Sequence, residues 1–227
     1  MIENLPVHIN ILFILTVLLT VWLFLKAVKN PTKILFIILL WLIAQSTLSL
    51  LGFYLNTETI PPRLIFLAPP ALIFIVVLFL TKKGRLFIDE LSPKWLTYLN
   101  VVRIPVEIVL FMLFLNNQIP QIMTFEGRNF DILAGLSAPF IAHLGYTKNK
   151  LNKSVLLLWN LICLTLLFNI VITGILSAPT PFQKFSFDQP NVAVLYFPFT
   201  LLVCFIVPVV LFSHLALLRQ LSKKDNS

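Results

Sequence analysis

TYLNVVRIPVEIVLFMLFLNNQIPQIMTFEGRNFDILAGLSAPFIAHLGYT, residues 97–147, is the stretch that decides how this chain is organised. It consists of two hydrophobic segments joined by a polar loop at 116–130. Within or at the edges of the apolar segments it carries Asn100, Arg103, Glu107, Asp131 and His143. The rest of the chain is mostly apolar with basic ends, so we expect the intramembrane ion pair of the chain to form here.

The composition is that of a membrane protein. The 227 residues are 59% hydrophobic and 11% charged, with a mean hydropathy of +0.95, whereas an average soluble domain is roughly 25% charged. Several apolar runs of about 18 residues or more match the length needed to cross a ~30 Å hydrocarbon core as a helix. Alternating strand patterns are absent, so we predict an all-α polytopic bundle in the cytoplasmic (inner) membrane and exclude a membrane β-barrel.

The apolar runs predict one transmembrane domain over residues 1–227 with seven helices. Their approximate ranges are 7–25, 32–54, 62–81, 93–115, 129–147, 153–176 and 192–221. The first run follows an acidic residue, Glu3, and no small-residue cleavage site comes after it. We therefore interpret it as a retained helix and not as a signal peptide.

The basic residues predict the orientation, because cytoplasmic ends of membrane helices retain Lys and Arg. Fourteen of the seventeen fall on one side of the seven-helix arrangement: Lys26, Lys29, Lys33, Lys82, Lys83, Arg85, Lys94, Arg103, Lys148, Lys150, Lys153, Arg219, Lys223 and Lys224. The other side has Arg63, Arg128 and Lys184, and the acids Glu3, Glu58, Glu126, Asp131 and Asp188. We therefore predict an external N-terminus and a cytoplasmic C-terminus.

Several classes of protein are excluded by what the sequence lacks. The net charge of +8 does not indicate a nucleic-acid partner, because the cations lie in short clusters between apolar runs. Cys163 and Cys204 lie inside apolar segments, so we expect neither a disulfide nor a metal site. Residues 192–218 contain no lysine for a retinal Schiff base. Motifs of metalloproteases, serine hydrolases and nucleotide-driven pumps are also absent.

Arg103 and Glu107 are the two residues whose charges have the highest free-energy cost of insertion into a bilayer. Asn100, Arg103 and Glu107 lie within about 60° of one helix face, and side chains four residues apart can meet. Glu107 is twelve residues past Trp95, which at ~1.5 Å per residue places it about 18 Å deep, near the middle of a bilayer. A lone charge at that depth costs at least ~2.5 kcal/mol. A binding or proton-handling site and a structural ion pair therefore both remain open.

Two further groups of residues are candidates for a site. Glu126, Arg128 and Asp131 are expected to form either the rim of an outward-facing pocket, with Lys184 and Asp188, or an ordinary solvated loop. Asp131, Gly135, Ala138, Ala142 and Gly145 share one narrow helix face, which favours close helix packing over a binding role.

His143 and His214 each lie about four residues from the cytoplasmic end of a predicted helix. Two such imidazoles can ligate a haem axially. We favour interfacial histidines bonded to polar neighbours, because no second pair and no cofactor motif accompanies them. The expected cofactor set is therefore empty.

The three predicted helices before residues 93–115 and the three after them have a similar arrangement of helices and loops. The segment KILFIILLWLIAQ from Lys33 can be aligned with KSVLLLWNLICL from Lys153. This weak internal repeat predicts a 3+1+3 arrangement, a layout that some small sugar facilitators use. Their paired helix-proline motif is not reproduced here.

The stretches MTFEGRNFDILAG at 123–135 and LFSHLALLRQL at 211–221 resemble segments of uncharacterised bacterial seven-helix integral membrane proteins. That resemblance covers most of the chain and implies no activity.

We predict a membrane protein that binds a small or amphipathic ligand between its helices, as a transporter or a sensor does, with Arg103 and Glu107 as the polar anchor. The first alternative is a membrane enzyme in which Glu107 acts as acid or base and Arg103 holds an anionic group. The second is a structural subunit without a site. The expected partners are the lipid bilayer and a small-molecule or lipid ligand.

Overall fold

The computed structural model describes residues 1–57, 59 and 61–223 and is all-α, with no strand in these residues. Glu58 and Lys224, which contribute to the predicted charge asymmetry, lie outside the described residues. Six helices are long and apolar enough to cross a membrane: Val7–Ala27, Pro31–Leu50, Arg63–Leu80, Pro93–Leu115, Lys153–Ser177 and Leu202–Ser222. Ile132–Thr147 is apolar but shorter.

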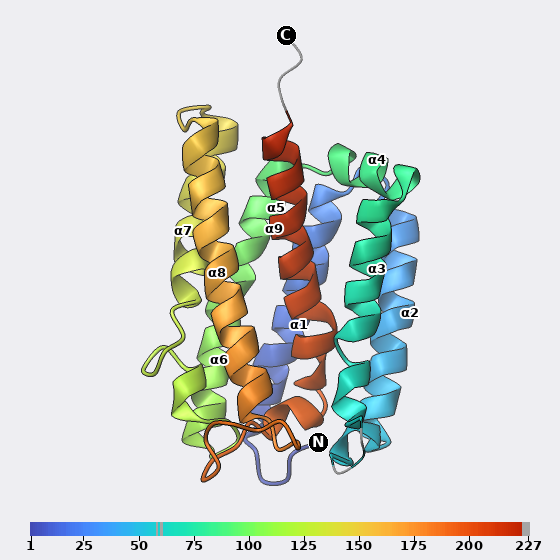
Figure 1. The fold of residues 1–227 in the computed structure, drawn as a ribbon, viewed down its shortest axis with the longest axis vertical. Coiled ribbons are helices and arrows are strands. Elements are labelled where there is room, and N and C mark those ends of the chain that lie inside the picture. The colour runs from blue at the N-terminus through green and yellow to red at the C-terminus, as the bar shows by residue number, and fades with distance from the viewer. Residues whose placement is uncertain (58, 60, 224–227) are drawn as a thin grey trace.

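The helices form an upright bundle with the N-terminus at one end and the last turn of the C-terminal helix at the other (Figure 1). The α-helices are α1 (Val7–Ala27), α2 (Pro31–Leu50), α3 (Pro69–Leu80), α4 (Lys82–Glu90), α5 (Pro93–Tyr98), α6 (Arg103–Leu115), α7 (Ile132–Ala142), α8 (Lys153–Ser177) and α9 (Val207–Ser222). The short turns are η1 (Phe53–Leu55), η2 (Arg63–Phe66), η3 (Leu99–Val102), η4 (Gln121–Met123), η5 (His143–Thr147), η6 (Ala193–Leu195) and η7 (Leu202–Ile206).

Local sequence signals explain several helix starts. Pro31 and Pro93 open α2 and α5, where a missing backbone N–H does no harm. The Asn152 side chain accepts a hydrogen bond from the Val155 N–H at the start of α8, at 2.9 Å. Thr81 caps α4 in the same way by accepting from the Gly84 N–H.

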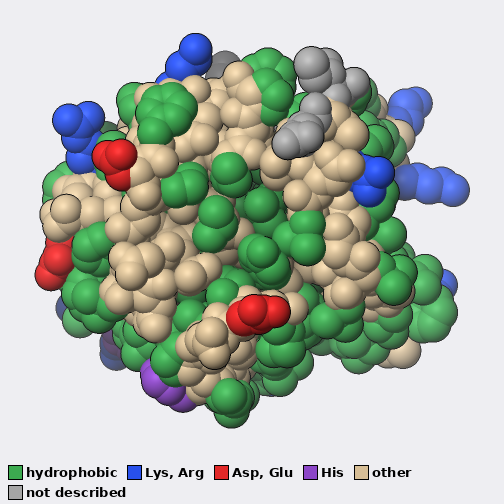
Figure 2. Space-filling view, turned by 90° about the horizontal axis from the view of Figure 1, so that it is seen from below, with side chains coloured by type: hydrophobic (Ala, Val, Ile, Leu, Met, Phe, Trp, Pro, Cys, Tyr) green, Lys and Arg blue, Asp and Glu red, His purple; other side chains and the backbone are tan. Residues whose placement is uncertain are grey.

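The centre and the periphery of the bundle differ in burial. α9 has no exposed side chain before its last residue, Ser222, and lies in the middle of Figure 1, whereas α3 has one buried residue, Ile75. Large hydrophobic side chains such as Leu18, Phe36 and Phe168 are exposed on the outer helices. Seen from the end that carries the N-terminus, hydrophobic side chains reach the outer rim (Figure 2). This exterior suits acyl chains as solvent.

Three of the predicted regular helices are irregular in the structure. The predicted helix at 93–115 tightens into a 3₁₀ turn at η3 just before Pro105, which has no N–H for the Val101 carbonyl. The predicted helix at 129–147 begins only at Ile132, contains Pro139 and ends in the wide turn η5. The predicted helix at 192–221 is broken after η6, and its long part starts near Leu202.

A tryptophan compensates for one of these prolines. Pro208 cannot donate to the Cys204 carbonyl one turn earlier, and the wide turn η7 lies at this point. The Trp41 indole N–H of α2 donates to that carbonyl at 2.9 Å. Because a buried carbonyl needs a partner, this bond ties α2 to the central helix at the place where α9 is irregular.

Helix α4 was not predicted from the sequence, which indicated only a short connection there. It lies across one end of the bundle in Figure 1, with Ile88 fully buried and Lys82 and Lys83 exposed. The Asp89 carboxylate accepts two hydrogen bonds from Arg219 of α9, both 3.0 Å, and also contacts Lys223. The hydrogen bonds from Arg219, with a further contribution from Lys223, hold the pKa of Asp89 below its usual value.

Candidate functional site

A buried polar cluster lies where α6, the start of α7, α8 and α9 meet. Its centre is Arg103, the first residue of α6, which is 2% exposed. One terminal nitrogen, Nη1, donates to the Asp131 carboxylate at 2.9 Å and to the Cys163 carbonyl at 3.1 Å. The other, Nη2, lies 2.9 Å from Nε2 of His214. A single guanidinium therefore connects three neighbouring segments.

The hydrogen bonds determine the tautomer of His214. A guanidinium only donates, so His214 Nε2 must be the acceptor and the ring proton lies on Nδ1. Nδ1 then donates to the Asn160 side-chain oxygen at 2.6 Å, and the Asn160 amide donates back to the His214 carbonyl at 3.0 Å. His214 is therefore a neutral, fully buried imidazole between Arg103 and Asn160.

Glu107 belongs to the same region but bonds to a different partner. It is 1% exposed, and its Oε1 accepts from the Asn129 amide at 2.5 Å. That amide also donates to the Met123 carbonyl, while the Asn129 side-chain oxygen accepts from the Asp131 N–H. These bonds leave one orientation for the Asn129 amide. Asn129 thus joins Glu107 on α6 to Asp131 at the start of α7.

The structural ion pair between Arg103 and Glu107, one of the two interpretations that the sequence left open, does not form, because Arg103 pairs with Asp131. The two residues stand four apart on α6, but Arg103 is directed toward α8 and α9, whereas Glu107 reaches the loop before α7. The ion pair therefore links α6 to the start of α7 instead of lying along α6. The sequence placed Asp131 externally and indicated no reason to connect it to Arg103.

The other predicted site residues lie elsewhere. Glu126, Arg128 and His143 are exposed, and among the described residues their side chains form no hydrogen bond or ion pair with the cluster; Lys184 and Asp188 are exposed too. Asn100 is buried, but its amide donates to the Leu96 and Thr97 carbonyls of the preceding turn. Asn129 and Asn160 were missed as site residues, since asparagine is common as a helix cap or in a polar stripe.

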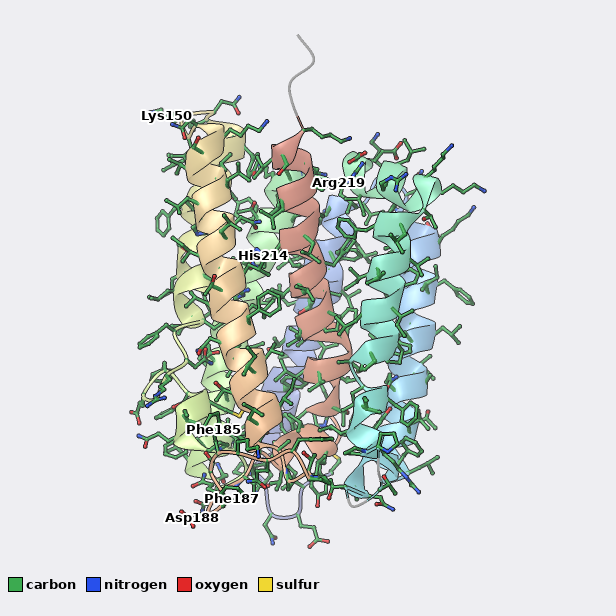
Figure 3. All side chains as sticks on the ribbon, in the orientation of Figure 1. Lys150, Phe185, Phe187, Asp188, His214 and Arg219 are labelled. Carbon is green, nitrogen blue, oxygen red and sulfur yellow. The ribbon has the colours of Figure 1, made fainter. Side chains whose placement is uncertain are left out.

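The two histidines do not fit a haem. Figure 3 places His214 between the ends of the bundle, with Lys150 and Arg219 toward one end and Asp188 at the other. Both ring nitrogens of His214 are already engaged, by Arg103 and by Asn160, so neither is free to ligate iron. His143 is exposed in the turn η5.

The predicted stripe of small residues packs helices closely, as expected. Gly135, Ala138, Ala142 and Gly145 are all buried. A Cβ atom added at Gly135 would lie 2.8 Å from Ile104 Cγ1 and 3.3 Å from the Asn100 carbonyl oxygen. The absence of that atom lets the start of α7 approach α6 closely enough for Asp131 to reach Arg103.

A separate cavity of about 430 Å³ lies between α2, α3, α4 and α9, with Phe24 of α1 at its edge. Its lining is hydrophobic apart from backbone: Phe24, Ile34, Ile37, Ile38, Trp41, Pro70, Ala71, Phe74, Ile75, Leu78, Phe87, Cys204, Phe205, Pro208, Val209 and Phe212. Neither Arg103 nor Glu107 is among these residues. The volume is in the range of small-molecule sites, roughly 300–1,000 Å³.

One comparison with known proteins assigns the chain to a family. The sequence profile of a family described as Domain of unknown function (DUF8737) matches residues 60–222. The chain belongs to this family. The DUF8737 match contains every residue of the polar cluster and the α3, α4 and α9 walls of the cavity, while α1 and α2 precede it. No curated protein and no solved structure matches the chain.

Proposed function

We propose that the chain is an integral protein of the cytoplasmic membrane that crosses the bilayer seven times, with its N-terminus outside. Six helices have the required length and composition, and Ile132–Thr147 supplies a shorter seventh. An apolar helix of 16 residues spans about 24 Å at ~1.5 Å per residue, about 6 Å short of the ~30 Å core, a mismatch that local thinning of the bilayer can accommodate. The end with α4 and the loop at 148–152 holds most of the described Lys and Arg residues, which supports a cytoplasmic location for that end.

Within that membrane, we propose that the protein binds a small amphipathic molecule whose apolar part fills the cavity between α2, α3 and α9. The observation that carries this proposal is the cavity itself, an apolar pocket of about 430 Å³ between helices, which is within the range of small-molecule sites, roughly 300–1,000 Å³. Ile37 and Phe74, which line it, are 50% and 54% exposed, so the cavity opens toward the lipid-facing surface. A ligand can therefore enter from the bilayer.

The position of the cavity favours an anionic head group on this ligand. Among the lining residues, Ile34 lies in the first turn of α2 and Phe87 lies in α4, the helix that crosses one end of the bundle (Figure 1). Lys33 precedes Ile34, and exposed Lys82 and Lys83 begin α4, whose residue Phe87 reaches the cavity. Basic side chains at the cytoplasmic surface attract anionic head groups by about 1 kcal/mol each. Transport and sensing are the two roles that such a site serves.

Quenching of tryptophan fluorescence tests the ligand site, because Trp41 lines the cavity. The purified full chain in uncharged detergent is titrated with bromine-labelled stearate, an anionic amphiphile that quenches tryptophan on contact. We expect saturable quenching. Ala71→Phe, which fills the cavity, is expected to weaken it at least tenfold. Val76→Phe introduces the same phenyl side chain at an exposed position of α3 outside the cavity, and is expected to bind like the wild type.

The head-group interaction has its own variants. Replacing Lys33, Lys82 and Lys83 by glutamine is expected to weaken stearate binding, whereas Lys148→Gln with Lys150→Gln, exposed at the same end but away from α4, is expected not to. Equal binding by Ala71→Phe and Val76→Phe would contradict the proposed site.

A further inference from the structure

We propose that the buried cluster of Arg103, Asp131 and Glu107 is a proton-binding site, in which Glu107 holds the proton as a neutral carboxylic acid. This inference goes beyond the ligand site and does not rest on it. It starts from the charges of the cluster, where two carboxyl groups share a single guanidinium. Arg103 makes its ion pair with Asp131, so Glu107 has no cation in direct contact within the described chain.

Among the residues that the structure describes, the neighbouring helices bring no second cation to Glu107. α1 and η4 pack against α6, and none of their buried side chains is ionisable. α7 begins after Asp131, which adds a negative charge, and α8 contributes the Cys163 thiol and carbonyl. α9 contributes His214, which the bond from Arg103 keeps neutral. With both carboxyl groups ionised, the cluster would carry a net charge of −1 inside the bundle.

A net charge of −1 is energetically unfavourable inside the helix bundle. An isolated carboxylate in a low-dielectric interior is so unfavourable that the group binds a proton instead. Asp131 receives a direct bond from Arg103 and remains the ionised partner, whereas Glu107 receives only one from a neutral amide. The carboxyl group that takes up the proton is therefore Glu107.

The geometry around Glu107 leaves a place for the proton. Oε1 is occupied as an acceptor by the Asn129 amide, whose orientation is determined by its other bonds. Oε2 is buried and has no hydrogen-bond partner among the described residues. Protonation at Oε2 converts the carboxylate and one H⁺ into a neutral acid and requires no other reactant. The same oxygen is the point at which a water molecule or a ligand group can exchange the proton.

Infrared spectroscopy of the full chain in lipid at neutral pH tests the proposal. We expect the C=O stretching band of a protonated carboxylic acid, shifted in D₂O, because exposed carboxyl groups are ionised at this pH. Growth with ¹³C-glutamate labels the glutamate side chains of the wild-type protein and is expected to shift the band. This test requires no substitution. Glu107→Gln is expected to abolish the band, while Glu126→Gln, an exposed glutamate in the next loop, is expected to keep it.

A second variant tests the charge balance. In Asp131→Asn, Glu107 becomes the counterion of Arg103 and ionises, so the band is expected to disappear there as well. A wild type without the band, a band that does not respond to ¹³C-glutamate, or a band that persists in Glu107→Gln or Asp131→Asn would each overturn the proposal. The isotope experiment uses the wild-type protein, so it tests whether a glutamate is protonated even if a variant fails to fold.

Discussion

Arg103→Met is expected to lower the free energy of unfolding by about 3–5 kcal/mol, the cost of removing one partner from a buried ion pair. The change leaves Asp131, 5% exposed, without its cation, and removes the bonds to the Cys163 carbonyl and to His214. Methionine keeps much of the length of the side chain, so the loss reports charge and hydrogen bonding more than volume. Reversible denaturation of the purified protein in detergent measures it.

Two comparisons make this result specific. Arg128→Met removes an exposed arginine of the adjoining loop and is expected to change stability by less than about 0.5 kcal/mol. Arg103→Met combined with Asp131→Asn leaves no unpaired charge, and is expected to recover part of the stability lost in the single variant. If Arg103→Met were as stable as the wild type, the cluster would not hold the helices together.

Gly135→Ala is the second substitution with a large expected effect, a destabilisation of about 1–3 kcal/mol from overpacking. The new Cβ atom would lie 2.8 Å from Ile104 Cγ1 and 3.1 Å from the Ile104 nitrogen, so α7 must move away from α6. Alanine generally stabilises a helix by up to about 1 kcal/mol relative to glycine. At position 135 we expect the destabilisation from overpacking to be larger than this gain. Thermal unfolding measures the sign of the change.

Gly174→Ala on α8 is the matched control. Its added Cβ atom meets only the end of a flexible side chain, Met123 Cε at 3.3 Å, and the Asn191 amide at 3.8 Å. Met123 can shift with little strain, so Gly174→Ala is expected to be neutral or slightly stabilising. The two substitutions are chemically identical, and equal effects at both positions would contradict the close approach of α7 to α6.

Much of the fold could be predicted from the sequence because long apolar runs favour one kind of element. Apolar runs of about 20 residues have one stable form in lipid, which is a helix with all its backbone bonds satisfied. The helices around Leu18, Phe36 and Phe168 follow from that alone. The small-residue stripe through Gly135 was also predicted correctly, since only small side chains allow such close packing.

The irregular parts were harder to predict, because they depend on tertiary contacts. Pro208 in the sequence suggests a kink, but the compensating bond from Trp41 joins residues 163 positions apart. Helix α4 is nine residues long and is stabilised by the contacts of Asp89 with α9, so its local sequence indicated only a basic connection. The packing partner decides such elements more than propensity does.

The candidate site was predicted in part. Arg103 and Glu107 stood out because charges within apolar helices are rare, and both are buried in the same cluster. Their partners were not predictable from spacing on one helix, since Asp131 and Asn129 come from the loop before α7, and Asn160 and His214 from α8 and α9. The cavity between α2, α3 and α9 leaves no local signal, because its lining is ordinary apolar helix.

The claim on which the rest depends is that the chain crosses the bilayer seven times, with Ile132–Thr147 as one of the crossings. Single cysteines at Glu3, Lys150 and Asp188, all exposed positions, are labelled in intact cells with a membrane-impermeant maleimide, and the native Cys163 and Cys204 are buried. Seven crossings require labelling at positions 3 and 188 and protection at 150 until the membrane is permeabilised. Labelling at 3 and 150 with protection at 188 would mean that α7 does not cross, and would contradict the account.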